Sequence, residues 1–201
     1  MTFELWIAAS LLSIGFLLFL ALIELLKRRF SLSSELTRRV VHVGAGISAL
    51  LDYLYLPGWL FLVLTLVGGA LFAVSFRFKV ITSVHNVVRK TYGELWLTAG
   101  IVGAYFISLV KPEVFIPALL IISLADSFAG LMSDLFRKPR KLWLGSFVFF
   151  LTSLTVLILT GNHPLWQSAV TALTLTLVER FSPRGSDNVA VPIAAAALLL
   201  L

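Results

Sequence analysis

Long apolar runs alternate with short polar segments along the whole 201-residue chain. A helix needs roughly 20 apolar residues to cross a bilayer core about 30 Å thick, and lipid excludes irregular backbone, so we interpret the runs as membrane helices. The predicted helices cover residues 4–26, 40–56, 59–76, 94–110, 114–133, 145–160, 165–180 and 189–201. The pattern predicts an all-α fold, a polytopic membrane helix bundle with about 7–8 transmembrane helices. The last run would extend only about 20 Å, so we expect it to pack in a groove of the protein or to span poorly.

Composition supports this prediction. Hydrophobic residues make up 59% of the chain, charged residues make up 13%, and the mean hydropathy is +1.00. A soluble fold of this length would need far more polar surface. The chain contains no cysteine, which excludes disulfides and thiolate chemistry.

The basic residues indicate an orientation in the membrane. Of the sixteen Lys and Arg residues, only Lys111 falls outside alternate gaps between the apolar runs. Cytoplasmic loops carry such an excess, so we expect those gaps, and a site beside them, to face the cytoplasm. The basic cluster Lys27–Arg29 follows the first run, the reverse of a cleavable signal peptide, so this run should remain as an anchor. The net charge of +6 then serves orientation and contact with membrane lipids, and we expect no nucleic-acid partner.

Asp126 lies well inside the fifth predicted helix, where an ionised carboxylate is unfavourable unless it faces a polar interior. Gly130, Ser133 and Arg137 follow on the same helical face. This stripe would admit a ligand, or else a neighbouring helix with Asp126 paired to an arginine.

A basic segment, RKPRKLWLGS, leads into the sixth predicted helix. Lys138 and Lys141 supply charge, Gly145 allows close approach of the backbone, and the helix start at Ser146 offers N–H groups to an oxyanion. The segment therefore suits phosphate, although alone it is also typical of a positive-inside anchor.

Two other segments carry polar side chains beside the same gaps. The second helix opens with Arg38, Arg39 and His42, of which His42 would orient a carboxylate, contact phosphate or bond to a neighbouring helix. Glu94 begins the fourth helix, where a glutamate also stabilises the helix dipole.

Glu179 ends the seventh helix and leads through a turn of Ser, Pro and Gly to Asp187 and Asn188. Capping of the last helix would explain the Asp–Asn pair. Carboxylates at 126, 179 and 187 on one side of the membrane, opposite a basic loop, also predict a Mg²⁺ and phosphate site.

These segments together resemble a known family. The order RRVVHVGAG, YGELW, DSFAGLMSDLFRKPRKLWLGS and VERFSPRGSDNVAVP is similar to the membrane kinases that include dolichol kinase, phytol and farnesol kinases and the CTP-dependent diacylglycerol kinase. The resemblance implies transfer of the γ-phosphoryl group of CTP, or of another nucleoside triphosphate, to a polyprenol, a phytol-like alcohol or diacylglycerol. We expect a single membrane domain over 1–201, with an anchor helix and basic loop at 1–34 and a kinase-like catalytic core at 35–192.

The resemblance also implies roles for individual residues. On the family's pattern the nucleotide site would contain Asp126, Lys138, Lys141, Gly145 and Ser146, and the metal and phosphate side would contain Glu179, Asp187 and Asn188. Phosphoryl transfer needs neutralisation of charge on the moving group, which Mg²⁺ held by Asp126 and Asp187 would supply, with Arg38 and Arg39 adding positive charge for the nucleotide.

Three residues are candidates for the general base that accepts the proton of the alcohol: Glu94, Glu179 and His42. The chain differs from the family's pattern at Ser133 and Arg137, where glycines are usual, and at Leu144, where a glutamate is usual.

The hypothesis is a membrane enzyme that takes a lipid alcohol from the bilayer and a nucleotide from the cytoplasm, in a prokaryotic plasma membrane or an organelle membrane. A homodimer is one possibility. A cytidylyltransferase forming a CDP-lipid would use the same acids, Mg²⁺ and CTP. A small-solute transporter would use Asp126 and the last run, although apart from Asp52 the outer halves of the helices lack polar groups for a through-path.

Overall fold

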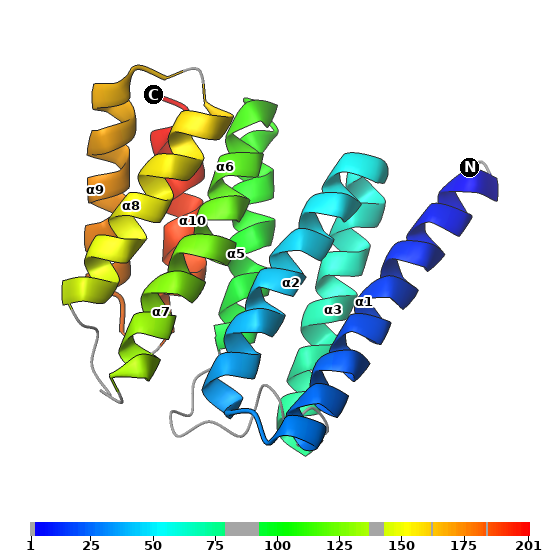
Figure 1. Ribbon diagram of the computed structural model, residues 1–201. Coiled ribbons are helices and arrows are strands. Elements are labelled where there is room, and N and C mark those ends of the chain that lie inside the picture. The colour runs from blue at the N-terminus through cyan, green and yellow to red at the C-terminus, as the bar shows by residue number, and fades with distance from the viewer. Residues whose placement is uncertain (1–2, 79–92, 137–142, 162, 184) are drawn as a thin grey trace. The chain divides into compact units, whose positions relative to one another are not determined.

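The computed structural model describes residues 3–78, 93–136, 143–161, 163–183 and 185–201 (Figure 1). These residues are 89% helical and contain no strand, which confirms the all-α prediction. They form eight helices when α6, η2 and α7 are counted as one. The chain divides into two compact units, Met1–Lys90 and Thr91–Leu201, which are described separately.

The described part of the first unit contains α1 (Phe3–Phe30), α2 (Ser34–Tyr55) and α3 (Gly58–Phe78). The three helices share a core of buried apolar residues, Leu20, Ile23, Val41 and Phe72.

Both α1 and α2 extend beyond the apolar runs that predict them. In α1, Arg28 pairs with Glu24 one turn earlier (3.0 Å), so the helix continues through the basic cluster. In α2, the helix begins at residue 34 because the Ser33 hydroxyl accepts a hydrogen bond from the backbone N–H of Leu36 (3.3 Å). Local side-chain interactions thus set helix ends that hydropathy does not reveal.

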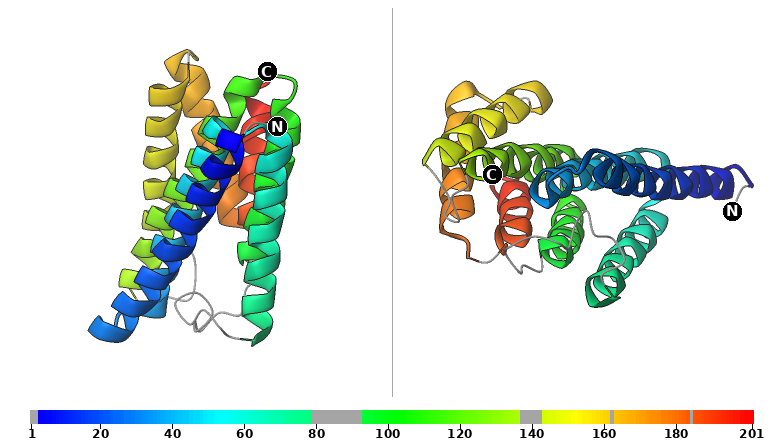
Figure 2. Two further views of the ribbon diagram at one scale, coloured as in Figure 1. Left: turned by 90° about the vertical axis from the view of Figure 1, so that its right-hand side faces the viewer. Right: turned by 60° about the horizontal axis from the view of Figure 1, so that its bottom comes forward.

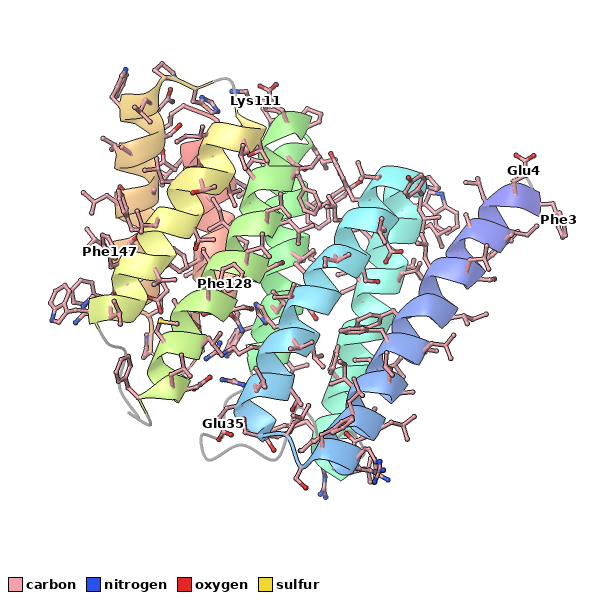
Figure 3. All side chains as sticks on the ribbon, viewed as in Figure 1. Phe3, Glu4, Glu35, Lys111, Phe128 and Phe147 are labelled. Carbon is pink, nitrogen blue, oxygen red and sulfur yellow. The ribbon has the colours of Figure 1, made fainter. Side chains whose placement is uncertain are left out.

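The second unit holds the remaining described elements: α5 (Gly93–Ser108), the 3₁₀ turn η1 (Pro112–Val114), α6 (Phe115–Leu120), the π-helical segment η2 (Ile121–Ala125), α7 (Asp126–Leu135), α8 (Trp143–Thr160), α9 (Leu165–Phe181) and α10 (Asp187–Leu198). The long helices alternate in direction, so α7 and α9 end, and α5, α8 and α10 begin, at the lower end of this unit in Figure 1. Lys111 lies at the upper end (Figure 3), where its ammonium donates to the Leu199 carbonyl (3.1 Å) and pairs with Glu113 (3.3 Å).

The described helices fit a membrane environment. Four stretches are long and apolar enough to cross a bilayer: Phe3–Phe30, Gly58–Phe78, Pro112–Met132 and Trp143–Thr160. Leu95–Ser108 and Asp187–Leu198 are shorter apolar helices. Large apolar side chains such as Phe128 and Phe147 remain exposed (Figure 3), as lipid-facing residues should. Every predicted run corresponds to a helix, with ends shifted by up to six residues.

The final helix, α10, is packed inside the protein. It begins at Asp187, two residues earlier than predicted, and its 12 residues extend about 18 Å at 1.5 Å per residue. Val191, Ala195 and Ala196 are fully buried against α5, α6 and α9. Of the two alternatives for this short run, the structure shows packing within the protein.

A close approach between α5 and α10 holds the final helix in place (Figure 2). A methyl group at Gly100 would meet the backbone carbonyl of Asn188 and would lie 2.7 Å from Pro192 Cγ. Pro192 has no N–H to bond the carbonyl four residues earlier, so this carbonyl is free to face α5. Glycine at position 100 thus lets the two backbones come together at the start of α10.

The fifth helix is interrupted by a π-helical segment that the sequence pattern does not predict. This segment, η2, joins α6 to α7 and ends immediately before Asp126. Ser123 lies within it, buried, and its hydroxyl donates to the Leu119 carbonyl (2.7 Å). A π turn is wider than an α turn and is frequently found at functional sites. The π turn changes the direction in which the Asp126 side chain projects, relative to a regular α-helix over the same residues.

Candidate functional site

Three carboxylates from distant parts of the sequence meet inside the second unit. Asp126, Glu179 and Asp187 each offer one oxygen, and these oxygens all lie within 4.8 Å of one another. The three residues are only 8%, 5% and 6% exposed, respectively. We call them the acidic trio. The structure therefore brings together the carboxylates at 126, 179 and 187 that the sequence places on one side of the membrane.

Helix ends and one tight turn position the trio. Asp126 is the first residue of α7, Glu179 lies in the last turn of α9, and Asp187 is the first residue of α10. Between α9 and α10, Gly185 has a φ of 86°, a left-handed conformation that glycine adopts without strain. The Ser186 hydroxyl donates to the carbonyl of Pro183 (2.8 Å) and closes the turn. The short connection returns the chain so that Asp187 comes back to Glu179.

Asn188 connects the trio to α5. Its backbone N–H donates to Asp187 Oδ1 (3.1 Å), and its side-chain Nδ2 donates to the carbonyl of Gly93 (2.8 Å). A carbonyl only accepts hydrogen bonds, so the Gly93 contact fixes the orientation of the amide. Asn188 Oδ1 is then a buried acceptor without a hydrogen-bond partner among the described residues. Because an unpaired buried polar atom costs about 1–3 kcal/mol, this position favours a hydrogen-bond donor or a cation.

The amino end of α8 is tied to the last turn of α9. Arg180 Nη1 donates to Ser146 Oγ (3.0 Å), and the guanidinium carbon lies 3.4 Å from the centroid of the Trp143 ring. Gly145 and Ser146 are buried, whereas Trp143 is exposed. The Gly–Ser pair of the predicted phosphate segment is thus fixed beside the helical turn that carries Glu179.

The other predicted site residues are less fully placed. Lys138 and Lys141 lie outside the described residues, and so does the side chain of Glu94, whose backbone begins α5. Arg38, Arg39 and His42 are half-buried on α2, in the first unit. The roles expected for all six residues stay predictions.

Two polar side chains next to the trio give no motif signal in the sequence. Ser127 follows Asp126, and its buried hydroxyl has no hydrogen-bond partner within the described part of the chain. Arg180 follows Glu179 and has the sequence pattern of an ordinary positive-inside charge. The contact between Arg180 and Trp143 joins two helices, so helical periodicity does not reveal it.

The chemistry of the trio fits a divalent cation. Carboxylate oxygens are the ligands that Mg²⁺ and other hard divalent cations prefer. Two full negative charges 4.8 Å apart repel by about 3 kcal/mol at an effective dielectric constant of about 20. When all three are ionised, such a buried group requires positive charge close by.

The fold and the site define a polytopic helical membrane protein with a buried carboxylate centre suited to a divalent cation. The chain is 28% identical to a phytol kinase of Synechocystis sp. (strain ATCC 27184 / PCC 6803 / Kazusa) over 213 residues, covering 98% of this chain and 91% of the relative. This similarity supports membership of the lipid-alcohol kinase family that the motifs resemble. No family model and no solved structure matches the chain.

Proposed function

We propose that the protein is a lipid-alcohol kinase that transfers the γ-phosphoryl group of a nucleoside triphosphate, with CTP as the donor, to the hydroxyl of a polyprenol, a phytol-like alcohol or diacylglycerol. The acceptor enters from the bilayer and the nucleotide from the cytoplasm. The observation that carries the proposal is the buried acidic trio, with its oxygens within 4.8 Å of one another. The similarity to a phytol kinase supports the same class of reaction at the level of the family.

In the proposed reaction the alcohol oxygen forms a bond to the γ-phosphorus. The bond from that phosphorus to the oxygen bridging it to the β-phosphate breaks, and a nucleoside diphosphate leaves with the electron pair. The proton of the alcohol passes to a carboxylate. Such a reaction depends mainly on positioning and on neutralising the charge of the phosphates.

Asp126 and Asp187 would hold Mg²⁺, which when bound would neutralise part of the phosphate charge. Mg²⁺ is commonly bound through one or two carboxylates together with substrate phosphates, so two aspartates are sufficient. Of the three candidate bases, Glu179 is the one that the described residues place beside both aspartates, and we assign it to the proton of the alcohol.

Asn188 would serve the metal side of this site rather than the phosphates. Its Nδ2 is engaged by the Gly93 carbonyl, and the atom left over is the acceptor Oδ1. A phosphate oxygen needs a donor, whereas a metal-bound water or an alcohol hydroxyl supplies one. In this proposal Asn188 Oδ1 therefore accepts a hydrogen bond from such a group.

The direct test is incubation of the purified protein with Mg²⁺, each γ-labelled nucleoside triphosphate, and a panel of prenols and diacylglycerol. We expect label in the lipid and release of the nucleoside diphosphate. Asp126→Asn should abolish transfer while the protein stays folded, whereas Asp134→Asn, the same change further along α7 and outside the trio, should retain it.

Three outcomes would contradict the proposal. Wild-type rates in the Asp126 variant would remove this residue from the mechanism. Absence of label with every donor and acceptor would reject the kinase. Release of pyrophosphate, with the α-phosphate of CTP entering the lipid, would indicate a CDP-lipid-forming cytidylyltransferase instead.

A further inference from the structure

Arg180 is a preorganised cation that follows Glu179 of the acidic trio in the last turn of α9. Its Cα lies about 3.8 Å from that of Glu179, the distance between consecutive residues. The guanidinium stacks on the Trp143 ring with its central carbon 3.4 Å from the ring centroid, and Nη1 donates to the buried hydroxyl of Ser146 (3.0 Å). Two contacts of different kinds thus fix the plane and the rotation of the side chain.

These contacts use only part of the hydrogen-bonding capacity of Arg180. A guanidinium carries five N–H donors, and the bond to Ser146 occupies one of them. A basic residue at the end of a helix often pairs with an acid one turn away. Among the described residues, however, Arg180 forms no ion pair and contacts a hydroxyl and an aromatic ring instead. Its remaining donors are available to a ligand.

Arg28 illustrates the ordinary use of a basic residue at the end of a membrane helix. Its Nε pairs with Glu24 one turn away on α1, and the Arg28 side chain is largely exposed. Such a charge orients the helix and contacts headgroups without any further support. Arg180 differs because it is half-buried and is held by two residues of another helix.

We propose that Arg180 binds the phosphate chain of the nucleoside triphosphate and that Trp143 and Ser146 hold its guanidinium in the orientation that this requires. The inference rests on the proposed function. A planar guanidinium matches two phosphate oxygens at once, and stacking on an aromatic ring reduces the freedom lost on binding. In this proposal Arg180 binds the nucleotide, whereas the preceding residue, Glu179, accepts the proton of the alcohol.

The test compares nucleotide affinity across a small set of variants of the full-length protein in detergent. Arg180→Ala should raise KM for CTP and the Kd for Mg·CTP about 10- to 100-fold, the value of charge-assisted hydrogen bonds, and leave KM for the lipid alcohol unchanged. Arg180→Lys keeps the charge without the planar fork and should fall in between. Trp143→Leu should weaken binding less than Arg180→Ala. Arg28→Ala is the matched control and should change neither constant.

Inorganic tripolyphosphate separates the phosphate contact from any contact with the base or the lipid. It should compete with Mg·CTP for the wild-type protein, and Arg180→Ala should weaken this competition by the same factor. Equal tripolyphosphate affinity in wild-type and Arg180→Ala would overturn the proposal. So would a change confined to KM for the lipid alcohol, which would make Arg180 a contact for the lipid headgroup. If Arg180→Ala unfolds, Arg180→Lys carries the comparison.

Failure of this inference can be told from failure of the proposed function. If the wild-type protein phosphorylates lipid alcohols but both Arg180 variants keep its KM and Kd for the nucleotide, the inference about Arg180 is wrong and the proposed function still holds. If the wild-type protein transfers no label from any nucleotide, the proposed function is wrong. The tripolyphosphate measurement needs no turnover and still decides the role of Arg180 in that case.

Discussion

Replacing Asp126 or Asp187 by asparagine should abolish the stabilisation of the folded protein by Mg²⁺. The substitution keeps the shape of the side chain and removes one of three negative charges within 4.8 Å. Neutralising one member removes two repulsive interactions of about 3 kcal/mol each. The net gain in stability is smaller, because hydrogen bonds to the carboxylate are lost and nearby cations already offset part of the repulsion. In EDTA the asparagine variants should therefore be at least as stable as the wild type, and in Mg²⁺ they should be less stable.

The expected shift is large enough to measure by thermal unfolding in detergent. A ligand at 100 times its Kd stabilises the folded state by about 2.7 kcal/mol. In a chain of this size, 1 kcal/mol moves the midpoint by about 2–4 °C, so the wild type should unfold about 5–11 °C higher in saturating Mg²⁺ than in EDTA. Asp126→Asn and Asp187→Asn should lose this shift, and Asp134→Asn should keep it. Glu179→Gln should keep most of it while losing turnover.

Two results would refute the reasoning about Mg²⁺, and a third would reassign Glu179. A wild-type midpoint that does not respond to Mg²⁺ would show that the trio binds no such cation. A full shift in Asp126→Asn would show that the cation binds elsewhere. Loss of the shift in Glu179→Gln would make Glu179 a ligand rather than the general base, and the proton would then need another acceptor.

The packing beside the trio leads to two further predictions. Gly100→Ala should destabilise the protein by about 1–3 kcal/mol and lower lipid phosphorylation, because the new methyl group meets the backbone of α10. Gly103→Ala is its control on the same helix: the added methyl meets only the flexible end of Ile193, so thermal unfolding and turnover should change less, and equal effects would contradict the argument. Asn188→Asp should lower the unfolding midpoint more than Asn188→Ala. The aspartate places an acceptor opposite the Gly93 carbonyl, which also only accepts, and it adds negative charge. The reverse order would mean that the amide is turned the other way.

The helices and the trio could be predicted from the sequence for one physical reason. Lipid cannot satisfy a backbone group or an ionised carboxylate, so run length indicates each helix, and an acid inside a run indicates a polar interior. Asp126 is such an acid. The basic gaps predict one side of the membrane for the site, and in the sequence Glu179 and Asp187 stand next to one of those gaps.

The finer geometry could not be predicted because it depends on contacts between helices. The π-helical segment before Asp126 lies in a uniformly apolar run, where α and π turns give the same hydropathy pattern. The orientation of the Asn188 amide depends on the Gly93 carbonyl, distant in sequence. The part played by Arg180 depends on the ring of Trp143, on another helix. None of these partners has a fixed spacing along the chain.

The short length of α10 sets the level at which Asp187 lies along the second unit. At the upper end of the second unit, Lys111 bonds to the carbonyl of Leu199, just beyond the last turn of α10. From there α10 extends only about 18 Å to Asp187, whereas a bilayer core is about 30 Å thick. The helix from Phe115 to Asp126 covers a similar distance in the same direction, so the two aspartates reach the same level. A final helix long enough to span would carry Asp187 past Asp126 towards the headgroups. The short helix, held by α5 at Gly100, instead begins where the carboxylate of Asp187 lies within 4.8 Å of that of Asp126.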